Sequence, residues 1–584
     1  MGRGRDRGLT ADRRPTGAGT VGIAALVCLL LLSGLAGAAL ALDIEFSGRP
    51  IKRDILAIYD GRHEKLPRDT RIHKFAELPL NHLGYRVTYL DVNGTLPPVR
   101  ELASYRGILT WLIEPMRAPG RYLEWLDAAT AAGLRFAFFS ELAPHEPRTH
   151  DDFVQRILGR IGLESTGQFV SVSKAATIVD INPAMIGFER PLGNLLPDFP
   201  VHVAVPGRAR VHLSVRTPTR IGERTAVLVS TSSGGGYVCD EISTFFEANT
   251  DKIRWIIDPF LFFKEAFGED RFPVPDVTTL SGRRIYFSHI DGDGWNNLTE
   301  VEQHRAARLT SGEVIAKEAI EPFPDLPVSV GLIAGDIDGD LGGDPRGAAL
   351  ARRLFALPQV EVASHTYTHP FDWSFFEAYS RADEEAKIAS TTRPAIPFVE
   401  RLRKGLIGLA GRSALTDQSN PYVAGSSDLP RTYLRHPFNL DKEVVDALKV
   451  SEQLAPAGKK AKLYLWSGDT TPFEAAIAAT RAAGVRNMNG GDSRLDKEYP
   501  SIFYVPPIAR PAGKQRQIYA VNSNENTYTN DWTGPFYGFF MLQNTLDNTE
   551  QPRRLKPFNL YYHMYSGEKA ASLASIKHFL ALAR

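Results

Sequence analysis

Short apolar runs alternate with helix-like stretches along much of this chain, and this alternation constrains its fold more than any other feature. Asp54–Tyr59, Gly107–Ile113 and Leu134–Phe139 are apolar runs typical of buried strands. Tyr122–Ala132, between the last two, has helical spacing. Strands and helices that alternate at such intervals predict a small parallel α/β sheet in an α/β protein.

The chain is too long for one compact core, because it has 584 residues. We expect a flavodoxin- or Rossmann-like α/β domain at residues 43–150. Residues 151–268 are β-rich and are expected to complete or follow that domain. A proline-containing linker at 269–282 then leads to residues 283–584, where seven or eight strand-like runs with helices between them predict a distorted (β/α) barrel.

The N-terminal segment, residues 1–42, predicts export from the cytoplasm. Five arginines precede an uncharged run from Val21 to Leu42, which ends in two A-x-A patterns typical of cleavage sites. The run is also long enough to cross a bilayer, for which about 20 apolar residues suffice. A cleaved signal peptide and a membrane anchor both remain open, and either places the body in the periplasm or outside the cell.

The remaining composition excludes two classes of partner. Without residues 1–41 the chain has 63 basic and 65 acidic residues, so there is no electrostatic basis for binding nucleic acid. No G-x-G-x-x-G follows any strand-like run of the first domain, so a nucleotide is not indicated. Membrane contact is expected through the N-terminal segment only.

Chemically capable side chains follow several strand-like runs of residues 283–584. Asp291 and Asp293 follow the first run, His365 and His369 a later one, and His563 the last. Barrel enzymes place their active sites at the C-terminal ends of strands, where these groups fall. Two imidazoles and one carboxylate suit a catalytic divalent ion with open positions, and the second aspartate can remain free as a base. With His563 to protonate a leaving amine, this set predicts amide or ester hydrolysis.

The motifs that carry these residues resemble those of NodB-type polysaccharide deacetylases. The H-T-x-x-H of His365–His369 resembles their metal motif, Arg435–Phe438 resembles R-x-P-[YF], and Tyr562-His563 lies where the final L-x-H is expected. The first motif reads H-I-D-G-D-G, with one glycine between the aspartates. Together with Trp466–Thr470, Asn487–Gly491, Asn522–Phe540 and Tyr561–Tyr565, it resembles the deacetylase part of PelA-like proteins of exopolysaccharide biosynthesis.

The resemblance implies a barrel of NodB deacetylase type that removes acetyl groups from N-acetylhexosamines of an extracellular polysaccharide. It implies Asp291 as general base, His563 as general acid and Arg435 as the residue that orients the base. It implies a metal site of Asp293, His365 and His369, with Zn²⁺ expected and Co²⁺, Mn²⁺ or Fe²⁺ as alternatives. Trp466 and Asp469 are expected to bind the substrate, and an exopolysaccharide export complex is the protein partner that this role suggests.

Two other functions remain open from the sequence. Glu114 and Glu141 follow strands of the first domain and form the pair that a glycoside hydrolase or lyase would use. A non-catalytic polysaccharide-binding or export scaffold would instead present aromatic side chains to sugar rings, with Trp295, Trp373, Trp466 and Trp532 as candidates.

Overall fold

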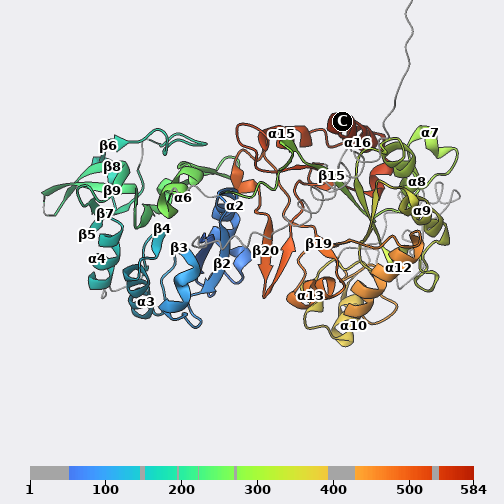
Figure 1. Ribbon diagram of the computed structural model, residues 1–584, viewed down its shortest axis with the longest axis horizontal. Helices are drawn as coiled ribbons and strands as arrows, with labels where there is room; N and C mark the ends of the chain where they lie inside the picture. The colour runs from blue at the N-terminus through green and yellow to red at the C-terminus, as the bar shows by residue number, and fades with distance from the viewer. Residues whose placement is uncertain are drawn as a thin grey trace, which may run out of the picture. The chain divides into compact units, whose positions relative to one another are not determined.

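Two eight-stranded sheets organise the computed structural model of this protein (Figure 1). The structure describes residues 51–144, 151–193, 196–220, 222–268, 273–391, 428–528 and 538–584. The predicted signal peptide or anchor at 1–42 lies outside these residues. In the described ranges, no helix has both the length and the apolar character needed to cross a membrane.

The first sheet combines the predicted α/β domain with the β-rich region that follows it. Its order is β2-β1-β3-β4-β10-β9-β8-β6, parallel from β2 to β10 and antiparallel from there to β6. The strands are β1 (Asp54–Tyr59), β2 (Arg86–Asp91), β3 (Tyr105–Leu112), β4 (Arg135–Ser140), β6 (Thr177–Ile181), β8 (Arg210–Thr219), β9 (Gly222–Ser232) and β10 (Gly235–Val238). Residues 151–268 therefore complete the first sheet.

Smaller elements surround this sheet. Two more strand pairs form separate small sheets, β5 (Leu163–Val170) with β7 (Phe199–Ala204) and β11 (Thr244–Glu247) with β12 (Lys252–Trp255). The helices are α2 (Glu77–His82), α3 (Pro119–Ala131), α4 (Asp151–Arg160), α5 (Asp240–Ser243) and α6 (Pro259–Phe267), and a π-helical turn, η2 (Ile72–Ala76), precedes α2.

The glycine run before Tyr237 allows β10 to join the parallel strands. Gly235 has φ 146°, and a Cβ there would lie 1.7 Å from the carbonyl oxygen of Phe136 on β4. Only glycine fits where two backbones approach so closely. In the central strands β1 and β4, the four inner residues are apolar and buried, as expected of strands covered on both faces.

The second sheet is curled like half of a barrel, in partial agreement with the expected (β/α) barrel. Its order is β20-β21-β19-β18-β17-β16-β15-β22, and all neighbours are parallel except β20 and β21. The strands are β15 (Tyr286–Asp291), β16 (Val328–Leu332), β17 (Val360–Ser364), β18 (Leu463–Leu465), β19 (Arg486–Met488), β20 (Ala509–Ala512), β21 (Gln515–Ile518) and β22 (Phe558–His563).

Helices cover the outside of this sheet, with α9, α12 and α13 visible along it in Figure 1. The helices are α7 (Glu302–Arg305), α8 (Ser311–Ile315), α9 (Pro345–Ala356), α10 (Arg381–Ser390), α12 (Ala447–Leu454), α13 (Glu474–Ala482), α14 (Glu525–Tyr528), α15 (Leu542–Asn548) and α16 (Ala570–Ala583). A strand pair, β13 (Thr279–Leu280) with β14 (Arg283–Arg284), precedes the sheet, and a π-helical turn, η11 (Lys442–Asp446), precedes α12. The parallel order brings the carboxyl ends of β15, β17 and β22 to one edge.

Candidate metal centre

The turn after β17 directs two imidazoles toward one point. His365 follows the strand directly, and the turn to His369 uses positive φ angles at Thr366 (74°) and at His369 itself (55°). Nδ1 of His365 lies 3.1 Å from the carbonyl oxygen of Leu465, which can only accept, so Nδ1 carries the hydrogen and Nε2 keeps its lone pair. Nδ1 of His369 lies 3.1 Å from Thr432 Oγ1. Both Nε2 atoms are therefore the ones available to a metal.

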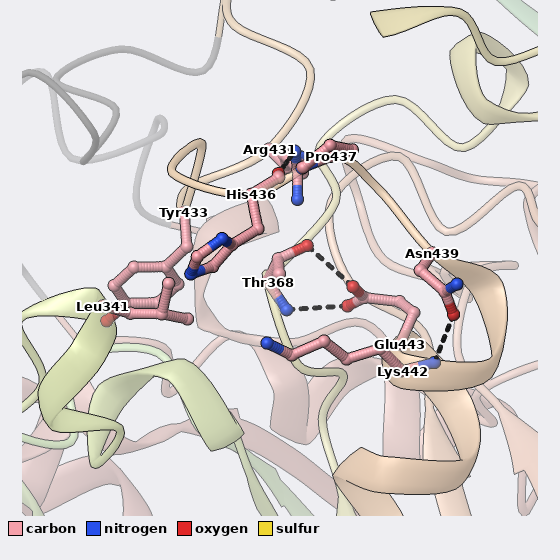
Figure 2. A pocket seen from close by; sticks show the side chains of 9 residues that line it. All are labelled: Leu341, Thr368, Arg431, Tyr433, His436, Pro437, Asn439, Lys442 and Glu443. Atoms are coloured by element: carbon pink, nitrogen blue, oxygen red, sulfur yellow. Dashed lines mark hydrogen bonds between the residues drawn. The ribbon is translucent and has the colours of Figure 1, made fainter.

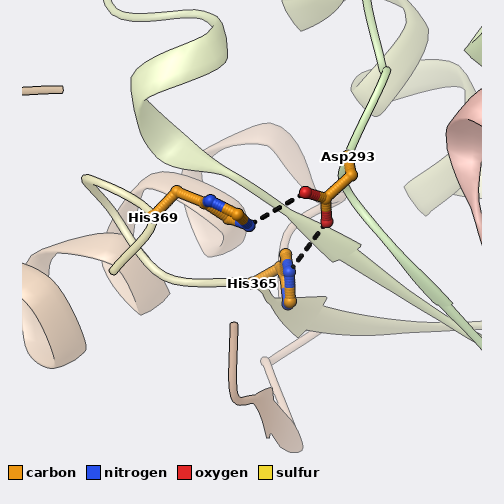
Figure 3. Close-up of side chains that lie close together, drawn as sticks. All are labelled: Asp293, His365 and His369. Carbon is orange, nitrogen blue, oxygen red and sulfur yellow. Dashed lines mark ion pairs between the residues drawn. The ribbon is translucent and has the colours of Figure 1, made fainter. Parts of the chain in front are cut away.

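Asp293 lies opposite these two nitrogens (Figure 3). Its Oδ2 is 3.0 Å from Nε2 of His365, and its Oδ1 is 2.9 Å from Nε2 of His369. The imidazoles are almost fully buried, whereas the Asp293 side chain is 25% exposed, so solvent reaches the group from this side. The three side chains together can offer ligand atoms to one ion.

The hydrogen bonds and charges of these three side chains are compatible with a bound cation. Nε2 of His369 is buried and, within the described part of the chain, makes no hydrogen bond of acceptable geometry, although Asp293 is adjacent. Burial opposes the charge on Asp293, but His369 and His365 outweigh it and hold the pKa of this carboxyl well below its usual value. Burial also disfavours a charged His369, but Asp293 outweighs it and raises the pKa of the imidazole. Oxygen and nitrogen atoms that face each other this closely need a positive charge between them, which either a proton on the imidazole or a divalent ion would supply.

Close backbone contacts explain why a glycine stands between Asp291 and Asp293. A Cβ at Gly292 would lie 2.9 Å from the Gly331 carbonyl oxygen and 2.9 Å from the Ile333 nitrogen, on and just after β16. The backbone therefore passes too close to the neighbouring strand for a side chain. Asp291 remains in β15, and Asp293 reaches the two histidines from the loop beyond it.

Asp291 is a separate buried carboxylate beside the metal ligands. The amide nitrogen of Asn489 lies 3.2 Å and 3.0 Å from its two oxygens, and the Tyr561 hydroxyl donates to Oδ2 at 2.7 Å. His289 is stacked on the Tyr561 ring with centroids 4.1 Å apart, so it packs behind the base. These contacts fix the orientation of a side chain that is only 1% exposed.

His563, at the end of β22, is paired with Asp291 in the sheet register. Its Nε2 lies 3.7 Å from Asp291 Oδ2, and its Nδ1 lies 3.2 Å from Glu525 Oε2. Glu525 is fully buried, and its Oε1 also accepts from the His563 backbone N–H and the Ser566 hydroxyl. Burial lowers the pKa of His563, but Glu525, and then Asp293 and Asp291, outweigh it and raise the pKa to about 9. A raised pKa favours the protonated form of the His563 imidazole.

Glu443 on η11 supports the turn that carries both histidines. Its Oε1 accepts from the backbone N–H groups of Tyr367 and Thr368, each at 2.8 Å, and its Oε2 accepts from the Thr368 hydroxyl at 2.7 Å. Figure 2 shows this carboxylate directed at Thr368. Because Glu443 is only 1% exposed, these bonds hold a buried charge against the backbone between the two metal ligands.

Three sequence-predicted site residues have other surroundings. The guanidinium of Arg435 is exposed and lies 3.3 Å from Asp340, and Asn489 and Tyr561 occupy the position beside the base that was expected for Arg435. The side chain of Trp466, which was expected to contact substrate, is fully buried and donates to Asn487. The Asp469 carboxylate is exposed and caps its own loop by accepting from Thr471 N at 3.1 Å.

Buried tryptophan side chains argue against the sugar-stacking surfaces that a non-catalytic binding scaffold would need. Trp295 and Trp373 are fully buried, as is Trp466, so they cannot stack on sugar rings. Trp532 lies outside the described residues. Glu114 is exposed at the end of β3, and Glu141 is half-buried after β4.

Four residues that contact the candidate site residues or the turn between the two histidines were not predicted from the sequence: Asn489, Glu525, Tyr561 and Glu443. The first three lie inside segments whose resemblance to PelA-like proteins was noted, Asn487–Gly491, Asn522–Phe540 and Tyr561–Tyr565. Those three motifs could therefore have identified Asn489, Glu525 and Tyr561 as residues near the site. Glu443 lies in a polar helical stretch, and no motif distinguishes it from other surface glutamates.

Comparisons with known proteins give no family. No protein-family model matches the chain, and no curated protein matches it significantly. Among solved structures, it is similar to a 4-alpha-glucanotransferase from Thermococcus litoralis (12% identity, TM-score 0.27, covering 51% of this chain and 36% of that one). It is also similar to alpha-L-fucosidase isoenzyme 2 from Paenibacillus thiaminolyticus (8%, TM-score 0.20, covering 31% and 28%) and to a glutamine amidotransferase from Thermotoga maritima (13%, TM-score 0.18, covering 32% and 75%). The chain spans little more than a third of the first of these proteins and less of the second, and at such TM-scores none of them indicates a fold family or a function.

Proposed function

We propose that this chain is a metal-dependent N-deacetylase that removes acetyl groups from N-acetylhexosamines of an extracellular polysaccharide. The observation that carries the proposal is the grouping of Asp293, His365 and His369 next to a separate base and a separate acid. Two imidazole nitrogens and one carboxylate oxygen suit Zn²⁺ with positions left for substrate and water. We further propose that the curled sheet is a barrel of NodB type, and the order of the motifs along the strands supports this.

The chain's own residues supply the proton transfers for amide hydrolysis. A divalent ion held by the three ligands would polarise the acetyl carbonyl and make a water more acidic. Asp291 takes the proton of the attacking water, and Asn489 and Tyr561 keep its carboxylate in place. His563 gives a proton to the sugar nitrogen as the C–N bond breaks, so the products are acetate and a free amine.

The sugar and the location of the enzyme are also part of the proposal. The PelA-like motifs support a polymer of N-acetylglucosamine or N-acetylgalactosamine as substrate, and an exopolysaccharide export complex as partner. The arginine-rich start and the apolar run from Val21 to Leu42 support a periplasmic or extracellular location, whether the segment is cleaved or remains as an anchor.

The test is metal analysis together with acetate release from oligomers of both amino sugars. Wild type should bind about one metal ion per chain and release acetate, and chelation should abolish release until Zn²⁺ is restored. Asp293→Asn should lose metal and activity, whereas Asp291→Asn should keep metal and lose turnover. Asp325→Asn, at an exposed aspartate paired with Arg584, is the matched control and should behave as wild type. Acetate release at the wild-type rate by both site variants would refute the mechanism.

A further inference from the structure

A cleft lies among the elements of the first sheet, and its lining residues are not those of the candidate metal centre. The cleft has a volume of about 770 Å³ and is lined only by residues between His63 and Ile253. Trp111 at the end of β3 and Asp240 directly beyond β10 contribute to its wall, so it opens near the carboxyl ends of parallel strands. Open α/β sheets bind their ligands at this edge.

Aromatic rings give the cleft an apolar wall that is open to solvent. Phe246 on β11 is 53% exposed, and it is paired in register with Ile253 on β12, which also lines the cleft. Phe75, half-buried on η2, packs edge-on against Trp111 and adds a second ring. The neighbouring Phe245 carries the Arg190 guanidinium 3.5 Å above its ring, so one of its faces is already occupied. A large ring left half-exposed beside a cleft marks a place where a flat apolar surface can bind.

Carboxylates provide the polar part of the lining. The Trp111 indole N–H donates to Asp240 Oδ1 at 2.7 Å, which fixes that carboxylate in the wall. Glu241 is exposed beside it, and burial together with Asp198 and Asp240 raises the pKa of Glu241. On another part of the lining, Glu64 accepts from the backbone N–H of Arg71 at 2.8 Å, and its side chain lies 4.0 Å from the Arg71 guanidinium. Lys74 also lines the cleft, so its charge is mixed, with acids concentrated at Asp240 and Glu241.

We propose that this cleft binds amino-sugar residues that carry a free amine, which makes it a non-catalytic site for the deacetylated polymer. The C–H face of a hexose ring is apolar and packs against an aromatic ring such as Phe246, while Glu241 and Asp240 accept from the ammonium and hydroxyl groups. The identity of the ligand rests on the proposed deacetylase function, because that reaction creates the amine. A chain held here remains bound while further acetyl groups are removed at the metal centre.

The test is binding of glucosamine hexamer and N-acetylglucosamine hexamer to the full chain carrying Asp291→Asn, measured by calorimetry. We expect the glucosamine hexamer to bind roughly tenfold more tightly than the acetylated one, as a new charge-assisted contact predicts. Adding Phe246→Ala or Glu241→Gln should each weaken its binding by about tenfold. Phe169→Ala, which removes an exposed ring on β5, is the matched control and should change nothing. Equal affinity in all variants, tighter binding of the acetylated hexamer or no binding at all would overturn the proposal.

A separate assay distinguishes this proposal from the proposed reaction. Chains with Phe246→Ala or Glu241→Gln but an intact Asp291 should release acetate from an N-acetylglucosamine trimer at the wild-type rate, because neither residue lies at the metal centre. If wild type releases no acetate but the hexamer binds with the predicted sensitivities, the reaction is wrong and the cleft stands. If wild type releases acetate but neither Phe246→Ala nor Glu241→Gln changes hexamer binding, the cleft proposal is wrong and the reaction stands.

Discussion

The side-chain amide of Asn489 lies within 3.2 Å of both carboxylate oxygens of Asp291, and its nitrogen also donates to the carbonyl oxygen of Trp466 at 2.9 Å. Asn489 has a φ of 115°, a backbone conformation that residues with side chains rarely adopt. The backbone carbonyl oxygen of Asn489 accepts from Gln517 Nε2 at 2.6 Å. This bond helps to hold the backbone in the positive-φ conformation. Backbone strain thus occurs at the residue that orients Asp291, the proposed general base.

Replacing Asn489 by glycine should impair catalysis without removing the metal. Glycine tolerates the positive φ, so the variant removes the amide but not the backbone conformation. We expect kcat to fall by roughly 10- to 100-fold, the usual effect of losing an outer-shell partner. The measurement is acetate release with metal content determined on the same sample. Unchanged kcat, or loss of the metal, would show that Asn489 does not act through Asp291.

Glu443 is expected to control metal affinity through the backbone. In Glu443→Gln the amide can accept at one atom only, so the N–H groups of Tyr367 and Thr368 and the Thr368 hydroxyl no longer all have an acceptor. The turn between His365 and His369 then loses its support, and metal affinity should fall by roughly 10- to 100-fold. Competition with a chelator measures this affinity. Glu452→Gln, on α12 and paired with surface Lys460, is the control and should bind metal as wild type does.

The pH dependence of activity should follow His563. A general acid works in its protonated form, and the pKa of His563 is raised to about 9. Activity is therefore expected to persist through neutral pH and to fall as the pH rises through about 9. Glu525→Gln removes the main group that raises this pKa, so the loss of kcat/KM should move to lower pH. A profile with the same alkaline limit in both proteins would assign that limit to another group.

The sequence predicted that the candidate site residues lie at or near the ends of strands. Asp291 and His563 end β15 and β22, His365 directly follows β17, and Asp293 and His369 lie in the loops just beyond, so parallel pairing brings all five to one edge. The D-x-D and H-x-x-x-H motifs therefore lie next to each other in the structure, as their places after parallel strands predict. The completion of the first sheet by residues 151–268 was left open, because the pairing of β4 with β10 joins segments that are distant in sequence.

The residues that were mispredicted or missed depend on tertiary contacts. Arg435 lies in an irregular segment after the isolated bridge between Pro370 and Arg431, and there Arg431 is the buried arginine, paired with Glu384 at 2.6 Å. A tryptophan after a strand looks the same in sequence whether it faces the core or the solvent, so the burial of Trp466 could not be predicted. Glu443 contacts a turn that is 75 positions away along the chain, and no local pattern records this.

Lys556 should make stability depend on pH. It is 5% exposed, its Nζ donates to the Pro506 carbonyl oxygen at 2.7 Å, and burial lowers its pKa from 10.5 to about 7. Between these two values the unfolded chain binds a proton that the folded chain lacks, so the free energy of unfolding rises with pH across this window. Below pH 7 the folded state bears the full cost of the buried charge, on the order of a few kcal/mol.

Lys556→Met should therefore flatten this dependence. The variant removes the buried charge at the cost of the hydrogen bonds of Nζ, so its stability relative to wild type should be greatest near pH 7 and smallest near pH 10. Urea denaturation at both pH values measures the difference. Lys514→Met, at an exposed lysine, should track wild type at each pH. A constant difference between Lys556→Met and wild type would show that the lysine keeps one protonation state throughout.

The register that pairs Asp291 with His563 also has a consequence for biosynthesis. Because β15 and β22 are the first and last strands of this sheet in the chain, a ribosome adds Asp291, Asp293, His365 and His369 well before His563. On the proposed function, a nascent chain that ends before β22 has the side chains that would hold an ion but lacks the imidazole that would protonate the amine. Amide hydrolysis would then require the last strand of this sheet.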